Sequence, residues 1–336
     1  MMEIDGSYGE GGGQIVRTAV ALAAVTGTPI RITKIRQGRP KPGLAPQHAQ
    51  AILALAEICS AKIHGIEPGS SEVTFEPGQI EGGNYRVDIG TAGSITLLVQ
   101  CLLPAMLKAE GPTTITVAGG TDVRWSPTID CFKNVFLPAL GEFKARVRLE
   151  CRHRGYYPRG GGSVVLKVDP GRLSTAHLKP QKSGVVEGIS HCSNLPEHVA
   201  WRQVESATKA LKDAGYESKV VFEVLNETSI GSGITLWSGY KGGSALGERG
   251  IRAEDVGKAA ADELIAELET PATVDTHLAD QLIPYLALAG GSYTVRQISK
   301  HTSTNIWTAK HFLNTEINVK NEEILKIEGR LTHWSN

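Results

Sequence analysis

An order of elements that recurs three times along the chain constrains the fold more than any other feature of the sequence. Each occurrence reads helix, glycine or proline turn, strand, polar loop and second helix. The helices carry apolar residues at every third or fourth position, and the strands are rich in β-branched residues. The helix, strand and helix fall at residues 17–25, 30–35 and 47–58, then at 94–107, 114–118 and 127–140, and last at 277–289, 293–298 and 304–313. Three units of one plan predict an α+β fold of βαβα-type units, in which helices cover β-sheets around a pseudo-threefold axis.

Residues 184–270, here called the central segment, lie between the second and third units and follow another pattern. Strands are expected at residues 185–190, 219–225 and 234–240, and helices at 197–213 and 253–268. This order predicts a small α/β domain inserted into a large domain made of residues 1–183 and 271–336.

The three units carry polar loops at equivalent positions, which is where we expect the chemistry. These loops span residues 36–41, 121–125 and 300–303. The third contains His301, one of ten histidines, directly before a helix. That position singles out His301 from the other nine.

A glycine-rich turn at residues 5–14 follows a short strand and opens a helix. Such a turn exposes backbone N–H groups and the positive end of a helix dipole, which suits a phosphate group. A carboxylate at Glu10 would repel phosphate unless a divalent cation lies between them, so Glu10 is a candidate Mg²⁺ ligand. The alternative is a plain strand-to-helix turn in which Glu10 stabilises the start of the helix.

Arg36, Arg39 and Lys41 place three cations in the first polar loop, which prolines stiffen. Arginine offers a bidentate fork to phosphate, and Gln47 and His48 just beyond could add neutral donors. The alternative is a solvated loop without a ligand. Residues 156–162 read as an ordinary β-turn.

Composition narrows the class of partner. Lys plus Arg and Asp plus Glu both number 35, so the formal net charge is zero and a long nucleic acid gripped non-specifically is disfavoured. Five cysteines without a CxxC pair favour a reducing cytoplasm over a disulfide framework or zinc knuckle. No apolar run reaches the length of a membrane span, so no membrane partner is expected. A homodimer is compatible with the sequence, which does not set the oligomeric state.

Seven ordered motifs resemble the RNA 3′-terminal phosphate cyclase family nearly end to end. They are DGSYGEGGGQIVRTAVAL, KIRQGRPKPGLAPQH, GTAGSITLLVQCLLPA, GGTD, RGYYPRGGG, HLADQL and KHTSTN. The resemblance implies a large domain of three repeats similar to the C-terminal half of a bacterial translation initiation factor. It also implies that the inserted small domain is thioredoxin-like.

The resemblance also implies a reaction. A histidine, matched here by His301, attacks the α-phosphorus of ATP and carries AMP on its imidazole. The AMP then passes to an RNA 3′-phosphate, and the adjacent 2′-hydroxyl expels it to leave a 2′,3′-cyclic phosphate. A neutral imidazole is nucleophilic near pH 7, which suits this covalent step.

Further roles follow from the motif match. Glu10 corresponds to the contact with Mg²⁺ or Mn²⁺. Positions that correspond to contacts with the ATP phosphates or the RNA phosphate are Gln14, Arg17, Arg36, Arg39, Gln47 and His48. Positions that correspond to the nucleotide pocket are Gln100, His277, Leu278, Ala279, Asp280 and Gln281, with Pro127 as the opposite wall of the adenine slot. Many members have tyrosine where this chain has His277, whose flat ring can still stack.

Three other classes of protein are alternatives to a cyclase. A non-catalytic relative that serves ribosome assembly lacks the nucleophilic histidine, whereas this chain has His301 and Glu10. An enolpyruvyl transferase has two repeat domains of similar size and lacks the GEGGGQ and HTSTN motifs. A plain RNA-binding protein is disfavoured by the zero net charge and by an aromatic content of 6%.

Overall fold

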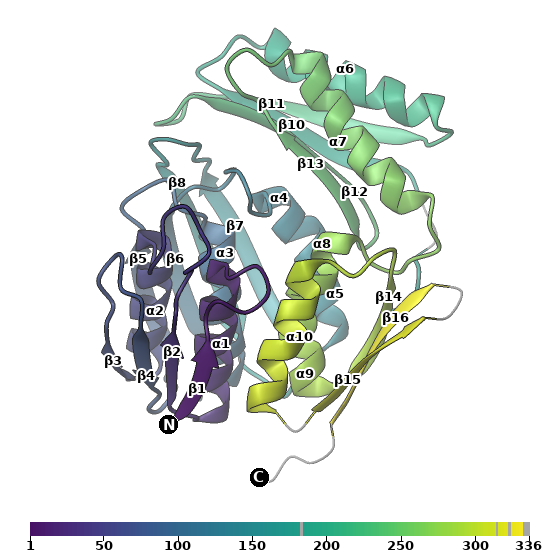
Figure 1. The fold of residues 1–336 in the computed structure, drawn as a ribbon. Helices are drawn as coiled ribbons and strands as arrows, with labels where there is room; N and C mark the ends of the chain where they lie inside the picture. The colour runs from purple at the N-terminus through teal and green to yellow at the C-terminus, as the bar shows by residue number, and fades with distance from the viewer. Residues whose placement is uncertain (182–183, 314, 322–323, 332–336) are drawn as a thin grey trace.

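The computed structural model describes residues 1–181, 184–313, 315–321 and 324–331, and its class is mixed α+β, as predicted. Four four-stranded sheets form the framework (Figure 1). Three sheets and their helices form one part of the molecule. The fourth sheet, from the central segment, lies across this part with two helices on its outer face (Figure 1).

The first sheet has the strand order β1-β2-β4-β3. Strands β1 and β2 are parallel, and the other neighbouring pairs are antiparallel. Its elements are β1 (Met2–Asp5), α1 (Gly13–Thr26), β2 (Ile30–Thr33), α2 (Pro46–Ile58), β3 (Lys62–His64) and β4 (Val73–Glu76).

The second sheet repeats this arrangement with the order β5-β6-β8-β7. Again the first pair is parallel and the others are antiparallel. Its elements are β5 (Gly83–Asp88), α3 (Ile95–Lys108), β6 (Thr113–Gly119), α4 (Ile129–Cys131), the π-helical turn η1 (Phe132–Phe136), α5 (Leu137–Glu142), β7 (Arg146–His153) and β8 (Gly162–Asp169).

The third sheet joins two distant parts of the chain. Strand β9, which precedes the central segment, pairs in parallel with β14, and β16 and β15 complete the order β9-β14-β16-β15. Its elements are β9 (Ala176–His177), α8 (Thr276–Gln281), α9 (Ile283–Ala289), β14 (Gly291–Val295), α10 (Lys300–Phe312), β15 (Thr315–Asn321) and β16 (Leu325–Leu331). The three sheets thus share one strand order, whereas the pseudo-threefold axis and the domain boundaries stay predictions.

The central segment forms the fourth sheet, with the order β11-β10-β12-β13. Its elements are β10 (Val186–Ser193), α6 (His198–Asp213), β11 (Ser218–Leu225), β12 (Gly231–Ser238), β13 (Lys241–Leu246) and α7 (Ala253–Leu268). Strand β13 was not predicted, because its Gly242-Gly243 pair reads as a loop. A Cβ on Gly243 would lie 2.4 Å from the Ala260 carbonyl oxygen, so helix α7 packs directly on the strand backbone.

Two predicted helices are interrupted near a proline. The helix expected at residues 127–140 starts at Ile129 and widens into η1 just before Pro138. The helix expected at residues 277–289 divides at Leu282, next to Pro284. Proline lacks the backbone N–H that would bond four residues back, so both breaks have the same cause.

The buried apolar residues form two clusters. The larger joins the first three sheets and includes Ile4, Leu102, Phe132 and Tyr285. The smaller lies between the fourth sheet and helices α6 and α7, with Leu236 and Leu264 among its members. Within the described residues, no helix combines the length and hydrophobicity needed to span a membrane.

Candidate active site

His301 lies in the first turn of α10. Ser299 caps this helix, because its side-chain oxygen accepts a hydrogen bond of 2.9 Å from the Thr302 N–H. The His301 side chain remains 46% exposed. A half-exposed imidazole at a helix N-terminus is accessible to an anionic substrate.

The glycine-rich turn of residues 9–13 packs against α10. A Cβ on Gly9, whose φ is +60°, would lie 2.6 Å from the Thr304 hydroxyl, so this close approach requires glycine. The Tyr8 ring stacks on Trp307 of α10 with 4.0 Å between ring centroids. These contacts bring Glu10 and Gln14 next to His301, although 287 residues separate Gln14 from it.

Two side chains hold the His301 ring. Gln14 donates a hydrogen bond of 3.1 Å to the His301 carbonyl, and its amide oxygen contacts Nδ1 of the ring. Nε2 lies 3.3 Å from Oε2 of Glu10. Burial lowers the pKa of His301, and Glu10 opposes this effect while Arg17 and Arg39 add to it, so the net effect favours the neutral imidazole.

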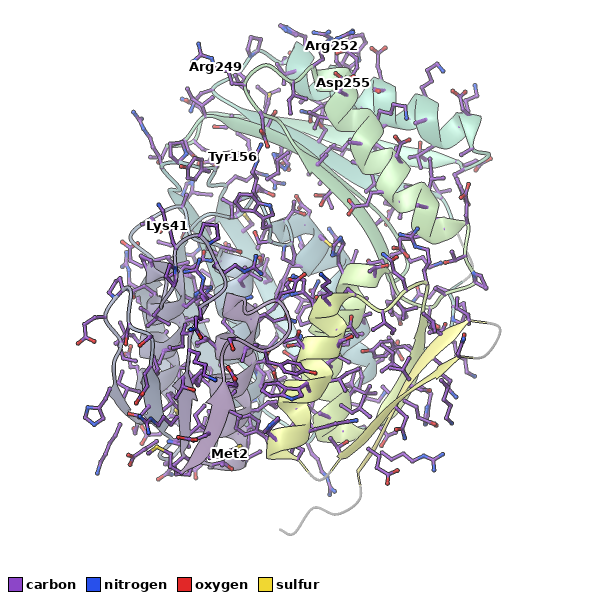
Figure 2. The ribbon with its side chains drawn as sticks, viewed as in Figure 1. Met2, Lys41, Tyr156, Arg249, Arg252 and Asp255 are labelled. Atoms are coloured by element: carbon purple, nitrogen blue, oxygen red, sulfur yellow. The ribbon has the colours of Figure 1, made fainter. Side chains whose placement is uncertain are left out.

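The first polar loop supplies one cation to this group. Arg39 lies 3.5 Å from the Glu10 carboxylate. Arg36 instead donates a hydrogen bond of 3.0 Å to the Gly43 carbonyl. Lys41 is exposed on the loop that follows β2 (Figure 2).

His48 is buried beneath the glycine turn, with 4% of its surface exposed. A Cβ on Gly13 would lie 1.9 Å from Nε2 of His48, so the ring packs directly on the backbone at the start of α1. Burial and the charges of Arg17 and Arg36 lower the pKa of His48 to about 3, which makes the ring neutral. Gln47 lies beside it, with 3.5 Å between its amide nitrogen and Nε2 of His48. The structure gives His48 a packing role, and its phosphate contact stays a prediction.

A cavity of about 420 Å³ extends from His301 to the central segment. Eight residues predicted for the site line it: Gln14, Arg17, Gln100, Pro127, His277, Asp280, Gln281 and His301. Leu278 and Ala279 do not, because both lie in the hydrophobic core. Glu10 lies in the glycine turn, against which Arg39 and His48 pack, and these three residues, Arg36 and Gln47 are absent from the cavity lining.

Arg17 and Asp280 are the two charged groups of the cavity that keep free hydrogen-bonding capacity. Among the described residues, no hydrogen bond or ion pair involves either side chain. Burial raises the pKa of Asp280 to about 7, although His277 and Arg17 oppose the shift. Burial also lowers the pKa of Arg17. Both side chains are thus partly desolvated and free to bind a ligand.

A chain of amide groups forms another wall. Gln100 donates a hydrogen bond of 2.8 Å to Gln281, which donates one of 3.1 Å to the His277 carbonyl. Behind it, Asn305 of α10 donates a hydrogen bond of 2.9 Å to the Asp280 carbonyl. The Asp280 carbonyl would normally accept a hydrogen bond from the N–H four residues later, but that residue is Pro284, which has no N–H. Because this break leaves the Asp280 carbonyl of α8 free, Asn305 of α10 can bind it, and the two helices are joined beside the cavity.

The central segment supplies the opposite wall, which the sequence analysis missed. Strand β13 contributes Gly242, Gly243 and Ser244, and α7 contributes Glu263. Glu263 accepts a hydrogen bond of 2.7 Å from the Ser244 N–H and lies 3.3 Å from Nε2 of His277. The hydrogen bond to Glu263 raises the pKa of His277 to about 9, so this ring is charged at neutral pH.

Trp125 is a further cavity residue with an unusual environment. Its side chain is 92% exposed, its φ is +61°, and the guanidinium of Arg124 lies 5.9 Å from its ring centroid. Arg124 in turn pairs with Glu248 of the central segment. The second polar loop indicated this position, but the sequence did not assign Trp125 a role. Other lining residues without a sequence signal include Thr18, Cys131 and Tyr285.

Comparison with known proteins agrees with the motifs. The family model described as RNA 3′-terminal phosphate cyclase matches residues 8–319. A protein named RNA 3′-terminal phosphate cyclase from Methanosarcina barkeri is 56% identical over 324 residues, covering 96% of this chain and 98% of the relative. Proteins of the same name from Archaeoglobus fulgidus and Pyrococcus furiosus are 51% and 47% identical, over 97% and 95% of this chain and 99% and 95% of theirs. The chain therefore belongs to the RNA 3′-terminal phosphate cyclase family.

Proposed function

We propose that this protein uses ATP to convert an RNA 3′-terminal phosphate to a 2′,3′-cyclic phosphodiester, through AMP bound covalently to His301. The observation that carries the proposal is the position of His301. Its imidazole lines the cavity of about 420 Å³, partly exposed and in contact with Gln14. Family membership supports the reaction, and the residues around the cavity support its individual steps.

Gln14 favours the tautomer that the first step needs. Its amide nitrogen donates to the His301 carbonyl, so its amide oxygen faces Nδ1 of the same residue. The reverse orientation would bring two carbonyl oxygens to 3.1 Å of each other. An oxygen at Nδ1 requires the proton there, which leaves the lone pair on Nε2 for attack.

The proposed reaction has three displacements. In the first, Nε2 of His301 forms a bond to the α-phosphorus of ATP while the bond to the pyrophosphate oxygen breaks. In the second, an oxygen of the RNA 3′-phosphate displaces the imidazole and takes the AMP. In the third, the 2′-hydroxyl attacks the 3′-phosphorus and expels AMP, losing its proton to solvent. Adenylylation makes the third step feasible because AMP is a far better leaving group than a terminal oxide.

We assign the nucleotide of the first step to this cavity. We place the adenine between Pro127 and the His277 ring, and the ribose near Gln100, Asp280 and Gln281. Arg17, which has no partner among the described residues, would face the phosphates. Positioning and charge neutralisation then account for most of the catalysis.

Glu10 is the residue that would hold Mg²⁺ or Mn²⁺. Its carboxylate is partly exposed and lies beside His301, and Mg²⁺ often takes a single protein carboxylate while phosphates and water complete its shell. The donor set fits such an ion, provided that Arg39 releases its pairing with Glu10. When bound, the ion would neutralise the phosphate charge that Glu10 would otherwise repel.

The remaining assignments rest on the glycine turn and the first polar loop. We assign Arg36, Arg39, Gln47 and His48 to contacts with the RNA 3′-phosphate, or with the ATP phosphates that precede it, on the motif match. A cytoplasmic enzyme is consistent with the five cysteines, all of which are free.

The test is the conversion of an RNA end. RNA labelled at its 3′-terminal phosphate is incubated with ATP and Mg²⁺ or Mn²⁺ and is then treated with phosphatase. A cyclic phosphate protects the label, so we expect ATP-dependent protection with the wild-type protein and none with His301→Ala. Equal protection by both proteins would contradict the proposal. No protection by either would favour the non-catalytic assembly-factor alternative.

A further inference from the structure

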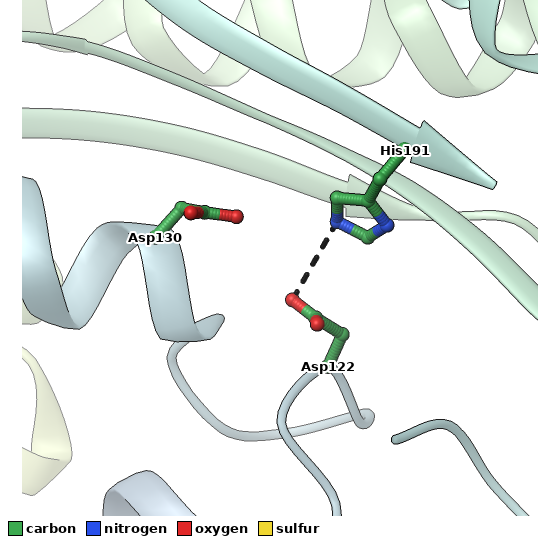
Figure 3. Close-up of side chains that lie close together, drawn as sticks. All are labelled: Asp122, Asp130 and His191. Carbon is green, nitrogen blue, oxygen red and sulfur yellow. Dashed lines mark ion pairs between the residues drawn. The ribbon is translucent and has the colours of Figure 1, made fainter. Parts of the chain in front are cut away.

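A buried polar cluster joins the second polar loop and α4 to strand β10 of the central segment (Figure 3). Asp122, Asp130 and His191 are 2%, 8% and 0% exposed. Their side chains point toward one another, and one potential ligand atom from each lies within 4.8 Å of the other two. The cluster is separate from the cavity, because none of the three residues lines it.

Two of these atoms lack a hydrogen-bond partner. Among the described residues, neither Oδ1 of Asp122 nor Nε2 of His191 has a partner, although both are fully shielded from solvent. The two atoms face each other at 3.7 Å, which is too long for a hydrogen bond. Buried polar atoms without partners are rare, so this pair requires an explanation.

A metal ion between the two atoms would account for this separation. Zn²⁺ binds imidazole nitrogen and carboxylate oxygen at about 2.0–2.2 Å, so two ligand atoms 3.7 Å apart can share one ion. The mixed nitrogen and oxygen donor set suits Zn²⁺ better than Mg²⁺ or Ca²⁺, which prefer oxygen alone.

The outer contacts of the ligands also suit a metal. Nδ1 of His191 lies 2.8 Å from the Tyr156 hydroxyl, so it can donate its proton there and leave Nε2 with a free lone pair. Oδ2 of Asp122 accepts a hydrogen bond of 2.7 Å from Thr121, which fixes the carboxylate with Oδ1 turned toward His191. Metal-binding histidines and carboxylates are commonly oriented by second hydrogen bonds of this kind.

The local charge leaves room for a cation. Arg154 lies 2.7 Å from Asp130 and 3.3 Å from Asp122, in both cases at Oδ2. One guanidinium therefore faces two buried carboxylates, and the half-exposed Glu223 adds a third at 3.3 Å. Buried charge without compensation is costly, so a divalent ion would relieve the excess of negative charge.

We propose that Asp122, Asp130 and His191 form a Zn²⁺ site, distinct from the ion expected at Glu10. The ion would hold strand β10 against the segment between Asp122 and Asp130. That segment contains Trp125 and Pro127, which line the cavity. The role of the ion is therefore structural: it fixes the central segment to one wall of the proposed nucleotide site.

The test is Zn²⁺ binding by the full chain, prepared without a polyhistidine tag and stripped with a chelator. A Glu10→Ala background removes the other expected ion. Zn²⁺ content after dialysis is measured by mass spectrometry, affinity by competition with a chromophoric chelator, and Tm by calorimetry. We expect one Zn²⁺ per chain and a Tm that rises on loading.

Substitution of the proposed ligands distinguishes Zn²⁺ binding at this site from Zn²⁺ binding elsewhere on the protein. His191→Gln and Asp122→Asn should weaken Zn²⁺ binding by more than about 100-fold, the upper range for loss of an outer-shell partner. The matched control is Glu223→Gln, which also contacts Arg154 but lies outside the ligand set and should keep the ion. If a ligand variant fails to fold by circular dichroism, Asp130→Asn replaces it. No Zn²⁺ on the wild-type chain, or equal affinity in ligand and control variants, would overturn the proposal.

Discussion

The cavity beside His301 and the buried cluster around Arg154 both contain polar side chains from distant segments. They differ in whether their charged side chains have partners within the protein. In the cavity, Arg17 and Asp280 have no side-chain partner among the described residues. In the cluster, Arg154 contacts Asp122, Asp130 and Glu223.

The difference between Arg17 and Arg154 is that between a group free to bind a ligand and a group that joins segments of the protein, while Asp122 Oδ1 and His191 Nε2 of the cluster stay unpartnered and are the atoms proposed to bind Zn²⁺. A group that must bind a ligand keeps its hydrogen-bonding capacity free at a cost in stability, whereas a group that holds segments together uses its capacity within the protein. Tyr156 illustrates the second case, because it lies where the loops of the second sheet meet the fourth sheet (Figure 2). Its N–H donates a hydrogen bond of 2.8 Å to Ser229 of the central segment.

The largest expected effect comes from breaking the cluster. Burial disfavours the charge of Arg154, but Asp122 and Asp130 outweigh this and raise its pKa. Arg154→Met should therefore lower the free energy of unfolding by about 3–5 kcal/mol in metal-free protein, because it leaves two buried carboxylates without their cation. Urea denaturation measures the loss. Arg148→Met, whose side chain is 79% exposed beside Asp169, is the control and should stay within about 0.5 kcal/mol of the wild type.

A smaller loss is expected from crowding the base of the candidate active site. Gly13→Ala would place a methyl group against the buried His48 ring, so it should destabilise the protein by about 1–3 kcal/mol. A double-mutant cycle with His48→Ala should recover part of this loss by making room. Gly38→Ala, which meets no heavy atom within 4 Å, is the matched control. Equal stability of the Gly13 and Gly38 variants would show that the turn does not rest on His48.

The charged form of Asp280 in the cavity should lower the stability of the protein, so removing it should raise stability. The pKa of Asp280 is raised from 3.8 to about 7, so the folded state binds a proton that the unfolded state releases between these values. Stability should therefore fall as the pH rises from 4 through 7. Asp280→Asn should flatten this slope and raise stability at pH 8 by on the order of 1 kcal/mol. Denaturation curves at several pH values would contradict the account if the slope were unchanged.

The smallest effect concerns the charge of His277. Glu263→Gln should move the pKa of His277 down from about 9 toward its ordinary value of 6.5, because the hydrogen bond to a carboxylate is lost. An NMR titration of the ring follows the shift. Stability should change little, since the His277 side chain is 73% exposed. Glu269→Gln, just beyond the end of α7, should leave the titration of His277 unchanged.

The sequence predicted the longer helices because their periodicity is regular, but it did not predict strands β3, β4, β5, β7, β9, β15 and β16. It also failed where a local residue overrides the period. Pro138 and Pro284 interrupt predicted helices, and Gly243 hides a strand because its lack of a side chain is a packing requirement. Periodicity carries no signal for such close approaches.

Site residues that belong to a sequence motif could be predicted, whereas residues that only the packing of the fold brings to the site could not. Gln14 and His301 stand in recognisable motifs, and the structure brings them into contact. Glu263 and Ser244 carry no motif, and their place in the cavity depends on how the fourth sheet packs across the others. The structure buries the His48 ring beneath the glycine turn, and the phosphate contact that its motif position predicts stays a prediction.

The most direct test of the central claim is covalent labelling with ATP that carries a radioactive α-phosphate. The wild-type protein, His301→Ala and a control on the same helix, His311→Ala, are incubated with Mg²⁺ or Mn²⁺ and separated on a denaturing gel. The account predicts an acid-labile label on the wild type and on His311→Ala, lost when RNA with a 3′-phosphate is added, and no label on His301→Ala. Full labelling of His301→Ala would contradict it.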